Sequence, residues 1–178
     1  AHSMGFFACG IAKAAPVDEV IALKYRQWLE KGEEASMAYM ANYLEKRLNP
    51  CLLVPGVRSI ISLALNYAPA QQIPKGEYQI AAYALGQDYH DLMKLKMREL
   101  ATKIAEQYQI PQNKEDEEPT IRCFCDTAPV LERYWAQKAG LGWVGRNHQL
   151  IIPHAGSMFF LGEIFLPFDT DNYDEPIP

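Results

Sequence analysis

The sequence has few cysteines, and their spacing points neither to a metal site nor to a disulfide framework. Of the 178 residues, four are cysteines, at Cys9, Cys51, Cys123 and Cys125, and no two of them form a C-x-x-C pair. A zinc site and a set of disulfides are both improbable from this spacing. Buried thiols in a reducing, cytoplasmic protein are the ordinary interpretation. Cys123 and Cys125 are two residues apart, so on a strand both would point away from the face of Phe124.

Long apolar runs and an excess of positive charge are also missing. The longest apolar stretches are far too short to cross a bilayer and we see no signal peptide, so we expect no membrane partner. The formal net charge is -5, which attracts no polyanion globally. A nucleic-acid partner would therefore need a local basic patch or a further segment. With 49% hydrophobic and 22% charged residues, the composition is that of one ordinary globular domain with a sizeable core.

Helical and strand patterns alternate along the chain. Apolar and β-branched runs predict strands within residues 1–14, 57–67, 120–125, 148–153 and 158–167. Helices are predicted at about 16–30, as one or two short pieces over 33–48 ended by Asn49-Pro50, from Asp88 onward, and at 129–139. One face of the long helix is expected to be core, and it carries Met93, Met97, Leu100, Ile104 and Tyr108. Residues 111–119 predict a solvated acidic loop. We therefore expect an α+β domain with a mixed β-sheet flanked by helices.

Three glycines form a pattern that also occurs in dinucleotide-binding folds. Gly140, Gly142 and Gly145 spell G-x-G-x-x-G. In those folds the pattern follows a strand and opens a helix, whereas here it follows a predicted helix and leads into a predicted strand. We therefore predict no nicotinamide site. We expect the glycines either to let the backbone approach a flat, bulky group or to pack tightly under Trp143.

Asp126 is the first candidate for chemistry, because it stands between a strand end and a helix start. One interpretation is an N-cap for a helix that begins at Pro129, although Thr127 could fill that role instead. The other is a carboxylic acid that stays protonated in a poorly solvated pocket and donates a proton to a developing alkoxide. Arg133 lies two helical turns further on and can face the same side, although an ion pair is the commoner role for an arginine.

The start of the long helix offers a carboxylate, a phenol and an imidazole within three residues. Asp88 alone would be interpreted as an N-cap, and His90 alone as a histidine satisfied in the first turn. Together with Tyr89 they weakly favour a polar ligand. Three more polar residues stand singly beside turns: Arg47, Asn147 and Ser157.

Several segments resemble the epoxyqueuosine reductase family and occur in the order that the family has. They are GFFACGIAKA, YLEKRLNPCLLVPGVRSII, LNY, YALGQDYHDLM, DTAPVLERYWAQKAGLGWVGRN and GSMFFLGEI. The resemblance covers nearly the whole chain, and DTAPVLER and AGLGWVGRN are its most specific parts. It implies the amino-terminal, cobalamin-binding domain of an oxidoreductase that reduces epoxyqueuosine to queuosine in tRNA. It also implies a fold like that of nitroreductase-type or reductive-dehalogenase cobalamin domains.

The same resemblance assigns roles to individual residues. It implies that Asp126 is the proton donor. The positions that it matches to corrin contacts or to the pocket are Arg47, Asp88, His90, Arg133, Asn147 and Ser157, and it implies backbone contacts to the corrin from Ala81, Leu150 and Leu161. No residue of the chain is expected to bind a metal ion. Arg146 stands where the family commonly has lysine, which keeps the charge but changes the geometry.

The resemblance also implies a longer enzyme. Residues 1–168 are expected to form the cobalamin-binding reductase domain, and residues 169–178 the start of a linker to a ferredoxin-like part with two 4Fe–4S clusters. No cysteine motif for such clusters occurs in this sequence, so the chain alone would have no electron supply. The implied partners are the anticodon loop of a tRNA and an external electron donor, and we expect a cytoplasmic monomer.

Two other functions remain open from the sequence: a non-catalytic cobalamin-binding or trafficking domain, and a flavin-dependent reductase on a related scaffold. A pure interaction module ranks third, because the cluster of site-like residues argues against it.

Overall fold

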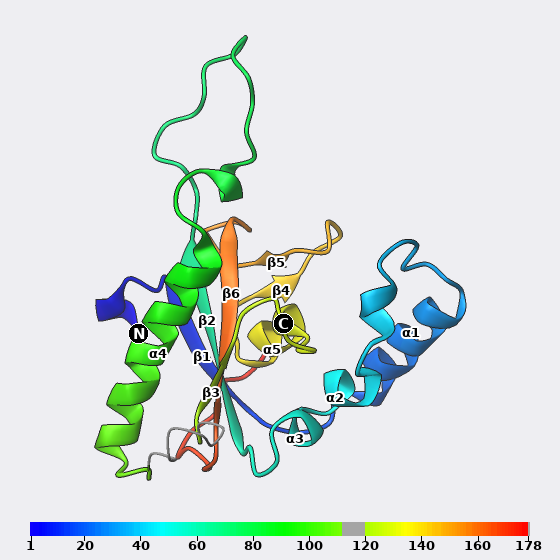
Figure 1. Cartoon of the computed structure of the whole chain (residues 1–178), viewed down its shortest axis with the longest axis vertical. Coiled ribbons are helices and arrows are strands. Elements are labelled where there is room, and N and C mark those ends of the chain that lie inside the picture. The colour runs from blue at the N-terminus through cyan, green and yellow to red at the C-terminus, as the bar shows by residue number, and fades with distance from the viewer. Residues whose placement is uncertain (112–119, 178) are drawn as a thin grey trace.

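The centre of the molecule is a four-stranded sheet with the order β1-β2-β6-β3. A computed structural model describes residues 1–111 and 120–177 (Figure 1). The strands are β1 (Ala8–Lys13), β2 (Ser59–Asn66), β6 (Phe159–Leu166) and β3 (Arg122–Phe124). β6 pairs antiparallel with both β2 and β3, so these two strands run parallel to each other on either side of it.

The prediction of an α+β fold is confirmed, but the described pairings of this sheet are all antiparallel rather than mixed. The reason lies in the place of β6. The long helix α4 (Tyr89–Gln107) carries the chain from β2 back to β3, as in a crossover between parallel strands. β6 then inserts between these two strands in the opposite direction, so no parallel pair is formed.

A helix lies against each face of the sheet. α4 covers one face and α5 (Glu132–Lys138) the other (Figure 1). On β2, Ile60 packs in the core with α5, and Ile61 and Leu63 pack in the core with α4. Because both faces of β2 are buried, the strand has a nearly continuous apolar sequence, and this explains why it was predicted without alternation.

The chain between β1 and β2 forms short helices to one side of the sheet (Figure 1). They are α1 (Glu19–Glu30), η2 (Ala38–Ala41), α2 (Leu44–Leu48) and α3 (Pro50–Leu53). α1 begins three residues after Pro16, with Asp18 as its N-cap. α3 was not predicted. The Asn49 side chain accepts a hydrogen bond from Cys51 N at 3.0 Å, so the Asn49-Pro50 pair that ends α2 also starts the next helix.

The face of α4 is mostly as predicted. Met93 and Met97 are fully buried, but Tyr108 follows the helix and is 58% exposed. Leu100 and Ile104 are partly buried and pack against the same core, as predicted, and the fully buried positions of this half of the helix are Ala101 and Ala105. The predicted acidic loop falls largely on residues 112–119, which lie outside the described residues. The two remaining short helical pieces are η1 (His2–Met4) and η3 (Ala82–Ala84).

A second, two-stranded sheet follows α5. Its strands are β4 (Trp143–Val144), which was not predicted, and β5 (Leu150–Ile151). A Cβ atom on Gly142 would lie 2.0 Å from the Ile151 carbonyl oxygen, so only glycine allows this close approach. The glycine pattern follows a helix and leads into a strand, as predicted. At Gly142, the absence of a side chain makes room for the backbone of Ile151.

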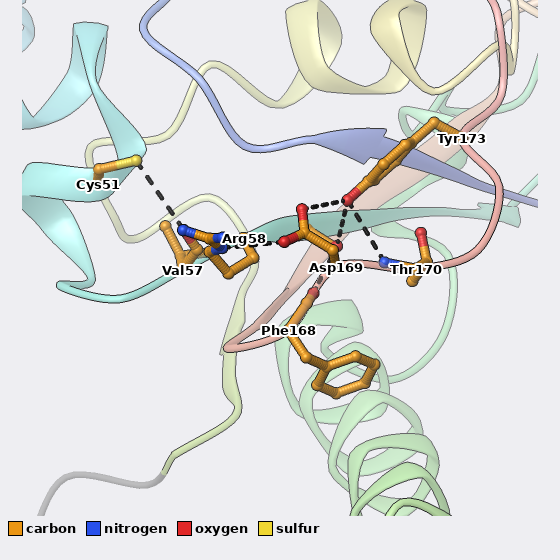
Figure 2. Close-up of polar contacts among 8 residues, drawn as sticks. Cys51, Val57, Arg58, Phe168, Asp169, Thr170 and Tyr173 are labelled. Carbon is orange, nitrogen blue, oxygen red and sulfur yellow. Dashed lines mark hydrogen bonds and ion pairs between the residues drawn. The ribbon is translucent and has the colours of Figure 1, made fainter.

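The segment after β6 stays in contact with the main sheet. Figure 2 shows the Asp169 carboxylate accepting hydrogen bonds from Arg58 Nε at 3.1 Å and from the Tyr173 hydroxyl at 2.9 Å. Asp174 N donates to Ile11 O at 2.9 Å, and Ile11 N donates to Asp174 Oδ2 at 2.7 Å, along the free edge of β1. The linker boundary at residue 168 stays a prediction. None of the described helices has the length and apolar character needed to cross a bilayer.

Candidate functional site

A cavity of about 420 Å³ lies where β2 ends and β6 begins. Its lining combines aromatic and charged side chains from separate parts of the chain: Tyr67, Tyr83, Tyr89, Asp126, Glu132, Arg133, Gln149, Phe159, Phe160 and Leu161. Five of these residues are aromatic and four carry charged or amide side chains, so the cavity offers ring faces together with several polar groups. Another cavity, of about 480 Å³, is lined by residues that include Ile110 and Thr120, but by none of the predicted site residues.

Asp126 stands at this cavity in an unusual backbone conformation. Its φ of 55° lies in the left-handed region, which aspartate and asparagine tolerate better than most residues. The backbone N–H donates to Glu132 Oε1 at 2.6 Å. The Tyr89 hydroxyl donates to Asp126 Oδ2 in a short hydrogen bond, and His90 Nε2 lies 3.5 Å from the same oxygen. The turn and these contacts hold the carboxyl group at the opening of the cavity.

The N-cap interpretation of Asp126 is wrong, and Thr127 does not take that role either. α5 begins at Glu132, its N-cap is Leu131, and no side chain caps it. Pro129 disfavours a helical residue before it, and the helix begins three residues later. The side chain of Asp126 is 44% exposed, so within this chain the pocket is more solvated than the sequence led us to expect.

Asp88 has the N-cap role that its position suggests. Its Oδ1 accepts a hydrogen bond from His90 N at 2.9 Å and lies 2.8 Å from His90 Nδ1. The bond from the His90 backbone is the main cause that lowers the pKa of the Asp88 carboxyl. Because Asp88 fixes one ring nitrogen of His90, the other nitrogen is directed toward Asp126. The geometry thus joins Asp88 and His90 to Asp126, and the weakly favoured polar ligand at this helix start stays a prediction.

Tyr89 connects this helix start to the sheet. Its ring stacks on Phe160 with the centroids 3.9 Å apart and the planes at 1°. Burial, and then the hydrogen bond to Asp126, raise the pKa of Tyr89 well above its usual range. The phenol therefore stays protonated and donates to the Asp126 carboxyl group.

Two further carboxyl groups lie behind Asp126. Burial, followed by the negative charge of Asp126, raises the pKa of Glu132 to about 8. Glu163 on β6 is fully buried, and burial followed by the charges of Glu132 and Asp126 raises its pKa well above the usual range. Neither residue was among the predicted site residues. The available signal was one charged residue inside the apolar strand Phe159–Leu166.

Arg133 and Leu161 also line the cavity, and their contacts to a corrin stay predictions. Arg133 Nη1 donates to the His148 carbonyl in a short hydrogen bond, and this joins α5 to the turn of the β4–β5 hairpin. β3 pairs with β6 only at residues 163–165, so the first half of β6, with Leu161, lies beyond the end of β3.

The remaining predicted residues do not line this cavity in the described part of the chain: Arg47, Ala81, Asn147, Leu150 and Ser157. Asn147 Oδ1 accepts a hydrogen bond from Gln149 N at 3.2 Å. Gln149 lines the cavity, so Asn147 and Leu150 are close in sequence to a lining residue. Arg47 lies on α2, and its buried Nε atom has no hydrogen-bond partner among the described residues. The described residues therefore leave this donor unused.

A family model and curated relatives match this chain. Residues 47–127 match the family described as "Epoxyqueuosine reductase QueG, DUF1730". The epoxyqueuosine reductase of Cellulophaga algicola is 41% identical over 174 residues, covering 98% of this chain and 54% of the relative. That of Cyclobacterium marinum is 44% identical over 176 residues, covering 97% of this chain and 54% of the relative. The chain thus spans about half the length of the curated relatives that it matches.

Solved structures agree. Epoxyqueuosine reductase from Streptococcus thermophilus superposes with a TM-score of 0.82 at 25% identity, over 99% of this chain and 46% of that chain. An epoxyqueuosine reductase in complex with an epoxyqueuosine-modified tRNA stem loop gives 0.78 at 26% identity, over 99% of this chain and 45% of that chain. The Bacillus subtilis enzyme, with an aspartate-bearing catalytic loop swung out of its active site, superposes with a TM-score of 0.72 at 26% identity. The match covers 99% of this chain and 45% of that chain. A catabolic reductive dehalogenase shares the fold alone, with a TM-score of 0.54 at 15% identity, over 99% and 19%.

Proposed function

We propose that this chain is the cobalamin-binding part of an epoxyqueuosine reductase, because residues 47–127 match that family's model and the chain is 41% identical to a curated relative over 54% of that relative's length. The proposed reaction is the reduction of epoxyqueuosine to queuosine in tRNA, with Asp126 as the proton donor. One observation carries the role of Asp126: its carboxyl group stands at the cavity between the Tyr89–His90 pair and Glu132.

The residues around the cavity fit a large ligand rich in amide groups, such as cobalamin. Five of the lining residues are aromatic, and Arg133 is exposed at the cavity. Outside the cavity, the buried Arg47 Nε has no partner among the described residues. In this proposal the ligand is held by the side chains of Arg47, Asp88, His90, Arg133, Asn147 and Ser157, with backbone contacts from Ala81, Leu150 and Leu161. When bound and reduced, cobalamin supplies the electrons of the reaction.

The protein's own contribution is to place and keep one proton. Reductive opening of an epoxide breaks a C–O bond, and the oxygen that takes the bonding electrons must be protonated. Tyr89 and His90 both contact Oδ2 of Asp126, which leaves Oδ1 as the oxygen to deliver the proton. Asp88 keeps His90 in its orientation through the 2.8 Å contact to Nδ1.

The partners of the whole enzyme also belong to the proposal. The net charge of -5 gives this chain no general attraction for RNA, so we propose that the tRNA anticodon loop is held largely by parts beyond it. A relative that has been solved with an epoxyqueuosine-modified stem loop supports tRNA as the substrate. Two 4Fe–4S clusters in the remaining half would pass electrons from an external donor.

The test is Asp126→Asn in the full-length protein. Asparagine tolerates the left-handed backbone and can still accept the Tyr89 hydroxyl, so we expect folding and cobalamin binding to be kept. Because the amide cannot give up a proton, single-turnover reduction with pre-reduced cobalamin should slow by roughly a hundredfold or more. Asp171→Asn, at an exposed position, is the matched control. A rate within a few-fold of wild type would remove Asp126 from the role and leave His90 as the next candidate.

A further inference from the structure

The direction of the Asp126 carboxyl group depends on neighbouring side chains more than on its own loop. Asp126 lies two residues after Phe124, the last residue of β3 that pairs with β6. The Cys125 carbonyl accepts a hydrogen bond from Thr127 N at 2.6 Å, which closes the turn around Asp126 but leaves its side-chain torsions free. The side chain is partly exposed, so the carboxyl group has room to turn toward solvent. Its orientation is therefore set by the groups that contact Oδ2.

Tyr89 supplies the closer of these contacts. Its hydroxyl donates to Asp126 Oδ2, whereas His90 Nε2 lies 3.5 Å away, at the limit of hydrogen-bonding distance. The hydroxyl of a tyrosine stands at the far end of a rigid ring. A ring that turned or tilted would carry the hydroxyl away from Oδ2. Whatever fixes the plane of the Tyr89 ring therefore also fixes the Asp126 carboxyl group.

Phe160 fixes that plane. The Phe160 and Tyr89 rings are parallel, with an angle of 1° between the planes and 3.9 Å between the centroids. Aromatic pairs are usually offset or tilted and further apart, so this pair leaves Tyr89 no room to tilt toward β6. The His90 ring also stacks on Tyr89, with the centroids 4.0 Å apart and the planes at 28°. Two ring contacts thus restrict the phenol.

Phe160 is itself anchored in the main sheet. It pairs with Leu65 in the register of β6 with β2. Its ring also contacts Tyr67, with the centroids 4.5 Å apart, and Tyr67 N donates to the Met158 carbonyl at 3.0 Å. A series of direct contacts therefore runs from the sheet through Phe160 and Tyr89 to the Asp126 carboxyl group.

Packing alone is the alternative role for these rings. Phe160 and Tyr89 both pack against the apolar core beneath α4, so the stack also helps α4 to dock on the sheet. Core packing does not require a hydroxyl directed at a carboxyl group in a cavity, and Tyr89 has one. A second ring pair, Tyr108 with Phe168, lies at the other end of α4 with its centroids 4.9 Å apart. That pair offers a comparison for packing without Asp126.

We propose that Phe160 is a positioning residue for Asp126 and acts through Tyr89. This inference rests on the proposed role of Asp126 as the proton donor. The stack keeps the Tyr89 hydroxyl on Oδ2, and this leaves Oδ1 free to protonate the epoxide oxygen. Tyr89 gives up no proton in this role, and Phe160 acts without touching the reacting atoms.

The first test is a double-mutant cycle in the full-length protein, at saturating, pre-reduced cobalamin. Tyr89→Phe keeps the stack and removes the hydroxyl, whereas Phe160→Leu keeps an apolar side chain and removes the ring. We expect each variant to slow single-turnover reduction roughly tenfold or more, because the donor is misplaced in the chemical step. The double variant should be no slower than the slower single variant, because both changes act through one contact. If the two effects multiply instead, Phe160 acts by another route and the proposal is overturned.

Phe168→Leu is the matched control. It removes a ring from the same core at the other end of α4, so its loss of stability should be similar to that of Phe160→Leu. Its single-turnover rate should stay within a few-fold of wild type. If Phe168→Leu slows the reaction as much as Phe160→Leu does, a general loosening of α4 explains both effects and the positioning role is refuted.

A second test needs no activity. In crystals of the full-length protein, the Asp126 carboxyl group should keep its contact with the Tyr89 hydroxyl in wild type and in Phe168→Leu. In Phe160→Leu we expect this contact to be lost in part or all of the molecules. An unchanged contact in Phe160→Leu would overturn the proposal, whatever the rates. Should Phe160→Leu not fold, Tyr89→Phe still decides, because a wild-type rate in that variant refutes the role.

The two proposals can fail separately. If Asp126→Asn is slow while Tyr89→Phe keeps the wild-type rate, the donor stands and the positioning role is refuted. If Asp126→Asn keeps the wild-type rate, the donor role fails, and Phe160 then has no donor to position.

Discussion

Glu163 illustrates how much of the site's chemistry depends on single residues that the sequence alone leaves unremarked. It is the one charged residue of β6, flanked by apolar neighbours on a strand buried on both faces. Asp126, Tyr89, His90 and Glu132 gain their interest in the same way, from contacts that join α4, β3 and α5. The environment of each group, more than its type, sets its protonation state.

Replacing Glu163 with glutamine should change how stability depends on pH. Below about pH 3.5 the carboxyl is protonated in both states. As the pH rises, the unfolded chain loses this proton and the folded chain keeps it, so the free energy of unfolding falls. Glu163→Gln removes this loss. We expect equal stability at low pH and a variant more stable than wild type by roughly 1–3 kcal/mol at pH 8, measured by denaturant titration.

Glu99→Gln serves as the control for that measurement. The ion pair with Lys103 lowers the pKa of Glu99, so its stabilising effect is present above the unfolded value and is lost in acid. The control should therefore show a small effect of the opposite sign. A Glu163→Gln protein that is less stable than wild type at pH 8 would show that the carboxylate is ionised and has a favourable partner.

At the scale of elements, short pieces of structure set the site more than the long ones do. α5 begins at Glu132 instead of near Pro129, and this brings the Glu132 side chain back to the Asp126 N–H. The β4–β5 hairpin is also short, with its turn fixed to α5 by Arg133. Such a hairpin has little stability of its own, so it depends on close packing.

Gly142→Ala should destabilise this hairpin. The new Cβ would lie 2.0 Å from the Ile151 carbonyl oxygen, and because that atom is backbone, the strands must move apart. We expect a loss of ~1–3 kcal/mol in the free energy of unfolding, measured in urea. Val144→Ala, at a position 38% exposed on the same hairpin, should stay within ~0.5 kcal/mol. Equal effects of the two variants would contradict the close approach.

At the scale of the whole molecule, two segments outside the main sheet expose large apolar side chains. α1 has no buried residue, and Val20 and Leu23 are 64% and 54% exposed. In the segment between β2 and α4, which projects from the end of the sheet (Figure 1), Tyr78 and Ile80 are 97% and 57% exposed. The chain spans about half the length of its curated relatives, so in the proposed enzyme a larger part of the site's surroundings is built by the rest.

This chain by itself should bind cobalamin at least tenfold more weakly than the full-length protein. Much of the surface that would bury a bound corrin comes from the other half in the proposed enzyme, and each tenfold in affinity corresponds to about 1.4 kcal/mol. Titration of both proteins with cob(II)alamin, followed by absorption, measures the difference. Tight, stoichiometric binding by this chain alone would contradict the expectation.

The sequence by itself determined the elements and the family. Apolar periodicity placed both ends of β2 and β6 and the start of α4 close to where they are observed, because a strand or helix buried along its length must carry the matching pattern. The segments DTAPVLER and AGLGWVGRN were sufficient for the family, and the order of elements around the glycine pattern excluded a nicotinamide site.

Only the tertiary structure decided what the polar residues do. Whether Asp126 caps a helix depended on where α5 begins, and Glu163 became a neutral acid because β6 inserts between β2 and β3 and buries it. The antiparallel sheet follows from the same insertion. These outcomes depend on which distant segments meet, and a local pattern of residue types carries no information about pairings over such separations.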